Sequence, residues 1–118
     1  MAAKAYVSFL RSNGNVYDNY VMRFNQLASV LLDGVEYVTM RKNANYIVLE
    51  PANNVDPDEK IFHVWHTRGV AMISLARLVR HDGAINQSAF GKRYKVKHDK
   101  QNRVYICMNE VVGYAGDQ

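Results

Sequence analysis

A basic and aromatic pattern near the end of the chain is the strongest candidate for chemistry in this sequence. Two strand-like segments, Lys92 to His98 and Arg103 to Met108, flank a polar turn. Because side chains alternate between the two faces of a strand, one register buries the apolar residues and leaves a basic face that holds one aromatic ring. That face would consist of Arg93, Lys95, Lys97, Arg103 and Tyr105.

Such a face suits the phosphate groups of a nucleic acid, because each neutralised phosphate releases bound counterions. An exposed tyrosine can also stack on an unpaired base. From Arg77 to Arg103 there are eight Lys or Arg residues and only two acids, and we expect Arg77 and Arg80 to support the same surface. The alternatives are a solvated outer face whose cations protect an edge strand from aggregation, and a contact surface for an acidic protein.

The residues that could catalyse a reaction or bind a metal form no recognised motif. Cys107 has no nearby sequence partner, and no phosphate-binding loop, dinucleotide glycine pattern or Gly-x-Ser-x-Gly motif occurs. A strand would direct His63 and His66 to opposite faces, so we expect no metal site. The sequence therefore predicts a protein that is not an enzyme and needs no cofactor. A metal-free nuclease using His81 or His98 as general base is the enzymatic alternative.

The first half of the chain predicts strands around one short helix. Asn25 can cap a helix in which Leu27, Val30 and Leu31 share one face, and Asp33-Gly34 would end it. The expected strands are Ala5 to Leu10, Val16 or Tyr17 to Phe24, Glu36 to Arg41 and Tyr46 to Glu50. An acidic surface loop at 52–60 would follow them.

The second half of the sequence repeats this plan. A strand over Ile61 to His66, a turn at 67–69 and a helix capped by Ser74 precede the basic hairpin. Trp65 is expected to anchor the core, and the alternative is a ring that faces a partner. Leu27 to Leu31 aligns with Leu75 to Val79, and Tyr37 aligns with Tyr94. We therefore expect an α+β fold with antiparallel sheet and two short helices. It would be a tandem β-α-β-β pseudo-repeat with halves at about 16–51 and 61–109.

Length and composition predict a single domain over residues 1–118, with 48% hydrophobic residues available for a core. A lone cysteine favours a reducing compartment, and we expect a cytoplasmic protein. No apolar run approaches the roughly 18 residues that span a bilayer, so no membrane partner is expected. The positive excess of the net charge of +4 lies in residues 61–118, which hold nine Lys or Arg against four acids.

One stretch carries a family resemblance. The pattern Val21-Met-Arg-Phe-Asn25, Leu27-Ala28, Leu31-Leu32-Asp33-Gly34 and Tyr46 to Pro51 resembles the swapped-hairpin DNA-binding domains of the AbrB and MazE family. The likeness covers about 30 residues and departs from that family at Asn25 and Gln26, where the family has basic residues. A second resemblance is to single-stranded-DNA-binding folds of the positive-cofactor type. Both imply dimers, so a duplicated chain would act as a monomer with pseudo-twofold symmetry or as a homodimer.

The functional expectation is therefore a non-enzymatic nucleic-acid-binding protein, with DNA favoured, that contacts the phosphate backbone through the basic hairpin. The alternative is a small interaction or inhibitor factor of a phage or mobile element. Such a factor would act on a host complex that handles nucleic acid, through the same basic face. The affinity for nucleic acid should fall steeply with salt in the first case.

Overall fold

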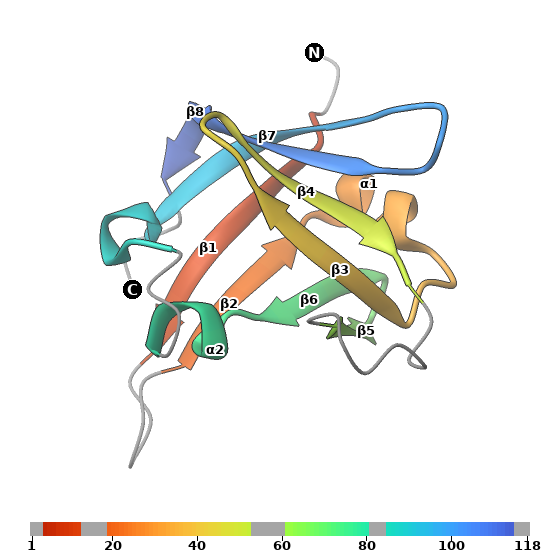
Figure 1. Ribbon diagram of the computed structural model, residues 1–118, viewed down its shortest axis with the longest axis horizontal. Helices are drawn as coiled ribbons and strands as arrows, with labels where there is room; N and C mark the ends of the chain where they lie inside the picture. Colours follow the sequence, from red (N-terminus) through yellow and green to blue (C-terminus); the bar gives the residue numbers. More distant parts are fainter. Residues whose placement is uncertain (1–3, 13–18, 53–60, 81–84, 115–118) are drawn as a thin grey trace.

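The strands of the chain close into a barrel in the computed structural model, which describes residues 4–12, 19–52, 61–80 and 85–114 (Figure 1). Within these residues there are eight strands, two short α-helices and two 3₁₀ helices. The elements are β1 (Tyr6–Ser12), β2 (Asn19–Phe24), α1 (Gln26–Ser29), η1 (Val30–Leu32), β3 (Tyr37–Lys42), β4 (Tyr46–Pro51), β5 (Ile61–Thr67), β6 (Val70–Ser74), α2 (Ala76–Arg80), η2 (Gln87–Ala89), β7 (Lys92–His98) and β8 (Val104–Tyr114).

The cyclic strand order is β1-β2-β6-β5-β3-β4-β8-β7, and every neighbouring pair is antiparallel. The expected α+β fold is therefore wrong, because the helices are single turns and the sheet is one closed barrel. Closure also removes the free sheet edge that the alternative reading of the basic face required. The β7–β8 hairpin is thus an internal part of the barrel wall, hydrogen-bonded to β1 on one side and to β4 on the other.

The missing element in the sequence prediction is β6. Arg68 and Gly69 both have positive φ, at 52° and 78°, and join β5 to β6 in a two-residue turn. Two positive φ values are the mark of the primed turns that suit the twist of a hairpin. The chain therefore turns back at once into a strand, where the prediction had placed no element before the helix.

The core fills the barrel interior with the inward half of each alternating strand. Its largest fully buried side chains come from strands all around the barrel and include Phe9, Met22, Phe24, Leu49, Ile73 and Ile106. Phe9 packs against Phe90 and Tyr94 with ring centroids 5.6 and 5.0 Å apart. The same alternation directs the other half of each strand to the outer surface, which is why strand phase decides which residues can meet a partner.

The two short helices cover opposite ends of the barrel (Figure 1). Asn25 caps α1 as predicted, since its side chain accepts a 3.0 Å hydrogen bond from the Ala28 amide, and it also accepts one from the Tyr6 amide. This end, which we call the α1 end, includes the turn between β7 and β8. The α2 end includes η2 and the turn between β3 and β4.

The element order is β-β-α-β-β in each half, so the predicted β-α-β-β repeat lacks one strand per half. If β1, β2, β3 and β4 are exchanged with β5, β6, β7 and β8 in turn, the same strands remain neighbours. The cyclic order is then the original order read in the opposite direction. The residue alignment behind the predicted repeat is less consistent, because Leu27 is 47% exposed while its counterpart Leu75 is fully buried. Of the predicted acidic loop at 52–60, residues 53–60 lie outside the described part of the chain.

Candidate nucleic-acid interface

Lys95 and Lys97 are the exposed centre of the predicted basic face. They alternate on β7 with the buried Tyr94 and Val96, so both lysines project from the outer wall of the barrel. In the register of the hairpin Lys97 lies opposite Tyr105 of β8. Two cations and one aromatic ring of the predicted set therefore share one patch.

A break in the strand register brings an acid into this patch. Tyr94 pairs with Val111, whereas the next residue, Lys95, pairs with Cys107, so β8 bulges between these two positions. The bulge places Glu110 on the outer side, where its Oε2 lies 3.6 Å from Nζ of Lys95. Both side chains are about half exposed, at 48% each. Such an exposed ion pair is weak, and a phosphate can replace the carboxylate.

Arg93 lies next to Lys95 in the outward row of β7 and is held more firmly than the lysines. Its guanidinium stacks over the ring of Tyr6 on β1, with Cζ 4.9 Å from the ring centroid. Its Nε is buried without a hydrogen-bond partner among the described residues. Arg93 therefore extends the basic row toward β1, in the order Lys97, Lys95, Arg93 along β7.

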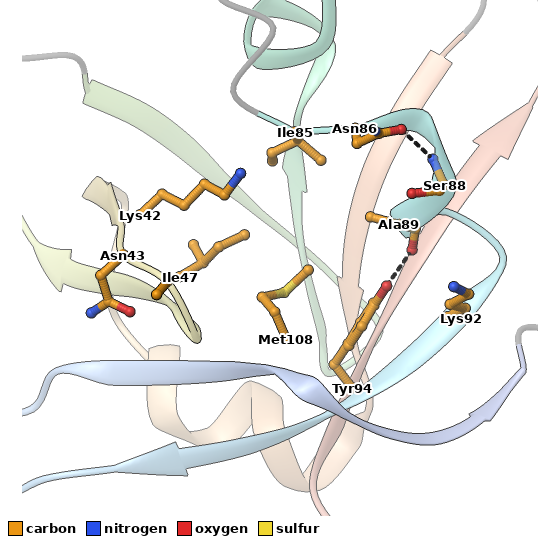
Figure 2. A pocket seen from close by; sticks show the side chains of 11 residues that line it. Lys42, Asn43, Ile47, Ile85, Asn86, Ser88, Ala89, Lys92, Tyr94 and Met108 are labelled. Atoms are coloured by element: carbon orange, nitrogen blue, oxygen red, sulfur yellow. Dashed lines mark hydrogen bonds between the residues drawn. The ribbon is translucent and has the colours of Figure 1, made fainter.

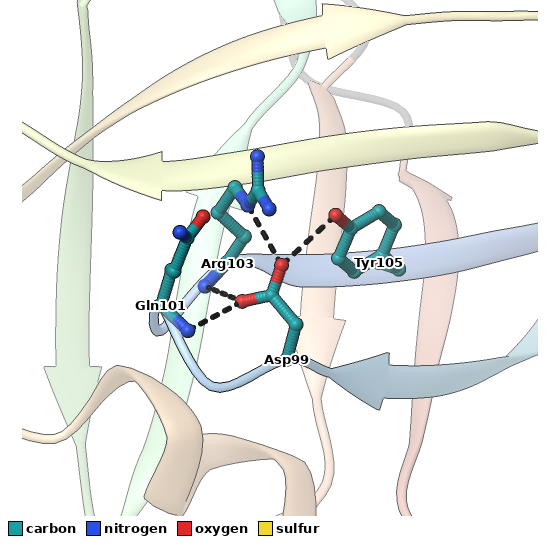
Figure 3. A network of polar contacts seen from close by, with 4 residues as sticks. All are labelled: Asp99, Gln101, Arg103 and Tyr105. Atoms are coloured by element: carbon teal, nitrogen blue, oxygen red, sulfur yellow. Dashed lines mark hydrogen bonds and ion pairs between the residues drawn. The ribbon is translucent and has the colours of Figure 1, made fainter.

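Arg103 and Tyr105 are bound to Asp99 in the turn between β7 and β8 (Figure 3). Oδ2 of Asp99 accepts hydrogen bonds from Nε of Arg103 at 2.7 Å and from the hydroxyl of Tyr105 at 3.0 Å. Oδ1 accepts from the amides of Gln101 and Arg103 at 2.9 and 3.0 Å. This carboxylate fixes the turn and the two side chains together, and it offsets the charge of Arg103.

Desolvation alone would raise the pKa of Asp99, but the hydrogen bonds from Arg103, Tyr105 and Gln101 outweigh it and lower that pKa to about 2. The hydrogen bond to Asp99 also raises the pKa of Tyr105 above its usual value, with desolvation as the second cause. Asp99 is therefore ionised and Tyr105 neutral at neutral pH. The aromatic ring of Tyr105 meets that of Tyr46 on β4 edge to face, at a centroid distance of 5.8 Å.

The predicted contribution of Arg77 to this surface is wrong. Its guanidinium lies 4.4 Å above the ring of Phe62 and donates a 3.4 Å hydrogen bond to the carbonyl of Ile61, both on β5. In the cyclic strand order β5 lies four strands from β7, so it stands on the opposite side of the barrel. Arg80 ends the same helix, α2, at the end of the barrel away from the β7–β8 turn, and its side chain lies outside the described part.

Trp65 is not the core anchor that the sequence predicted. It is 48% exposed on the outer face of β5, and its ring meets that of His63 edge to face at 5.2 Å. His63 in turn contacts Tyr37 of β3 at 5.4 Å. The alternation of exposed His63, buried Val64 and exposed Trp65 could have placed this ring outside, had β5 been read as half-buried.

Of the residues considered for metal binding or catalysis, those that the structure describes form no metal site. Among the described residues, no group of three or more His, Cys, Asp or Glu side chains could hold a metal ion. His63 projects outward, and Nε2 of His66 lies 2.8 Å from the carbonyl oxygen of Val35. His81, considered as a general base, falls outside the described residues. Cys107 is buried, and burial raises the pKa of its thiol.

Within the described part of the chain, no helix is long and apolar enough to cross a membrane. Comparison of the chain with protein-family models, with curated proteins and with solved structures finds no match in any of the three.

Proposed function

We propose that this protein binds nucleic acid, with DNA as the favoured form, through the outer face of β7 and β8, and that it acts as a binding protein and not as an enzyme. The observation that carries the proposal is the exposed pair Lys95 and Lys97 on adjacent outward positions of β7, with the ring of Tyr105 opposite Lys97. Arg93 continues the row. We call Arg93, Lys95, Lys97 and Tyr105 the basic patch.

The spacing of the patch supports contact with a phosphate backbone. Outward positions on one strand are about 6.6–6.8 Å apart, and consecutive phosphates of a single strand are separated by a similar distance when the strand is extended. Neutralising three phosphates releases condensed counterions, so the logarithm of the binding constant should fall with the logarithm of salt with a slope of about −2 to −3. This slope is small, and it predicts a modest affinity.

The aromatic rings favour an unpaired strand over a duplex. Tyr105 and Tyr46 form an edge-to-face pair next to the lysines, and Asp99 holds the hydroxyl of Tyr105 so that the ring does not have to be ordered on binding. Stacking of a base on such a ring contributes about 1–3 kcal/mol and is available only where bases are unpaired.

The test is a titration of fluorescently labelled single- and double-stranded oligonucleotides, followed by anisotropy at several salt concentrations. We expect saturable binding at low salt, stronger for the single strand. The variant Lys95→Glu with Lys97→Glu should abolish it. The variant Arg23→Glu with Arg41→Glu changes the net charge equally at two exposed positions on β2 and β3 and should bind as the wild type does.

The proposed function would be refuted if neither oligonucleotide bound the protein at low salt. An equal loss of oligonucleotide affinity in the two double variants would show that binding depends only on the net charge of the protein. A loss confined to the Arg23 and Arg41 variant would place the interface at β2 or β3, away from the basic patch.

An interaction or inhibitor protein is the second candidate, and the outward cluster of Trp65, His63 and Tyr37 favours it. Exposed aromatic side chains in contact with one another are common where proteins meet. Poly-glutamate provides a discriminating probe for the basic patch. If poly-glutamate displaces the labelled oligonucleotide as well as an unlabelled oligonucleotide of equal charge does, the patch recognises acidic surfaces in general. The function of binding a protein partner is then the better supported one.

A further inference from the structure

The bulge in β8 adds polar side chains to the outer surface beside the basic patch. Cys107 pairs with Lys95 and Val111 pairs with Tyr94, so residues 108–110 of β8 lie between two adjacent positions of β7. Bulges redirect side chains and are frequent beside functional sites. The side chains that this bulge presents therefore bear on what the patch can recognise.

The first residue of the bulge points into the barrel and the next two point outward. Met108 is half-buried and lines a pocket at the α2 end, between the β3–β4 turn and η2, together with Lys42 and Lys92 (Figure 2). Asn109 and Glu110 are exposed, and Glu110 is the acid of the patch described above. The bulge thus adds the Asn109 amide to the outer surface, at the α2 end of the patch.

Asn109 is joined to Asn45 in the β3–β4 turn. Nδ2 of Asn109 donates a 2.6 Å hydrogen bond to Oδ1 of Asn45. The backbone carbonyl of Asn45 accepts a 2.9 Å hydrogen bond from the Met108 amide, so the bulge and the turn are held together at two points. Oδ1 of Asn43 accepts from the amides of Asn45 and Tyr46 at 3.1 and 2.9 Å. These bonds hold the two exposed side chains, which we call the asparagine pair, in a defined position.

The asparagine pair lies next to the rings and cations of the patch. Asn45 immediately precedes Tyr46, whose ring meets that of Tyr105. In the strand register Tyr46 lies opposite Cys107, which in turn lies opposite Lys95. Tyr46 and Lys95 are therefore separated by two strand spacings, or about 10 Å, along one row. One nucleotide can span this distance with its phosphate at Lys95 and its base at Tyr46.

The chemistry of the asparagine pair suits the edge of a base. A side-chain amide offers a donor beside an acceptor, and its usual base contact is bidentate, to N6 and N7 of adenine. Nδ2 of Asn45 and Oδ1 of Asn109 take no part in the bond between the two amides, and they supply a donor and an acceptor. Lysines and tyrosine rings bind any sequence, so a base preference comes from groups such as these.

We infer that the asparagine pair recognises the base that stacks on Tyr46 and that it favours adenine. This inference rests on the proposed nucleic-acid function and specifies its base preference. Nδ2 of Asn45 donates to N7, and Oδ1 of Asn109 accepts from the N6 amino group. Thymine has no amino group, and guanine presents two acceptors on the same edge, so either base leaves the Asn109 oxygen unmatched. Cytosine has an amino group but only one ring to stack.

The test uses short fluorescent strands of abasic DNA that carry one base, adenine, cytosine, guanine or thymine, at the centre. Anisotropy titrations of the full chain compare them with the wholly abasic strand, which binds through the patch alone. We expect the adenine strand to bind at least about fivefold more tightly than each of the other three. The variant Asn45→Ala with Asn109→Ala should bind the adenine and guanine strands equally, because the two purines stack alike. It should bind the abasic strand as the wild type does, which also shows that it is folded.

The matched control is Asn19→Ala with Gln26→Ala, which removes two exposed amides from β2 and α1 and should keep the adenine preference. Three results would overturn the inference and leave the proposed function standing: equal binding of the four bases, preference for a base other than adenine, or an adenine preference that survives in the Asn45 and Asn109 variant. Failure of every strand to bind at low salt would refute the proposed function together with the inference.

Discussion

Nε of Arg103 lies 2.7 Å from Oδ2 of Asp99, and this bond shows how the β7–β8 turn prepares the outer face of the barrel. The same carboxylate accepts hydrogen bonds from two backbone amides of the turn and from the Tyr105 hydroxyl. Arg103 is consequently a structural cation of the turn. The positive charge that the patch offers to a partner comes from the exposed lysines of β7, Lys97 and the weakly paired Lys95.

The Asp99 carboxylate should make the stability of the protein depend on acid pH. Its pKa is lowered from 3.8 to about 2 in the folded protein. Its contribution to the free energy of unfolding is therefore complete above pH 3.8 and is lost as the pH falls toward 2. Urea unfolding of the Asp99→Asn variant should show a weaker loss of stability across this window than the wild type. The exposed Asp33→Asn variant is the control, and an unchanged profile for Asp99→Asn would contradict the role of the network.

Tyr105 should contribute to binding through its ring and only indirectly through its hydroxyl. Tyr105→Leu removes the stacking surface and should weaken single-strand binding by about 1–3 kcal/mol, or roughly 5- to 150-fold. Tyr105→Phe keeps the ring and should lose much less. Anisotropy titrations give both values, with Tyr37→Leu on β3, two strands from β8, as the control. Equal losses for the Leu and Phe variants would assign the effect to the hydroxyl and the turn.

Ser29 should be important for stability although its side chain is small. The buried hydroxyl accepts a 2.8 Å hydrogen bond from the amide of Ala71 on β6 and donates one of 3.2 Å to the carbonyl of Phe24. Ser29→Ala leaves the Ala71 amide without a partner, and we expect a loss of about 1–3 kcal/mol in the free energy of unfolding. Urea denaturation measures it. Gln26→Ala, on the exposed side of α1, should change stability by less than about 0.5 kcal/mol.

The Cys107 thiol should react slowly in the native protein. It is 2% exposed although it sits at an outward phase of β8, and burial raises its pKa. Labelling with a thiol-reactive disulfide at mildly alkaline pH should therefore follow the population of opened molecules and accelerate with denaturant. Thr67→Cys in a Cys107→Ala background supplies an exposed thiol that should react at once. Immediate labelling of native Cys107 would show that the outer wall opens at β8.

Local features of the sequence were predicted correctly because they depend on neighbours in the chain. The bounds of β7, the cap at Asn25 and the alternation of lysines with buried residues all follow from strand period and side-chain chemistry. The turn at Arg68 and Gly69 was also recognised, but the strand after it was missed. That omission prevented the prediction of eight antiparallel strands and hence of a closed barrel.

Which strands lie side by side depends on long-range pairing, and no local pattern specifies it. Tyr37 and Tyr94 align in the predicted repeat, yet Tyr37 is half-buried on the outer wall while Tyr94 is buried in the core. A shift of one residue in strand phase moves a side chain from one face to the other. Such a difference is invisible in an alignment of two similar hairpins.

The sequence by itself determined that Lys95 and Lys97 share a face with Tyr105, because the register that buries the apolar side chains of this hairpin directs these three side chains outward. Only the tertiary structure decided that Arg77 lies on the opposite side of the barrel, that Trp65 faces outward and that Lys42 and Lys92 meet at one pocket. The physical reason is closure: the circular order of the strands, set by the burial of one common core, brings distant segments together and separates near ones.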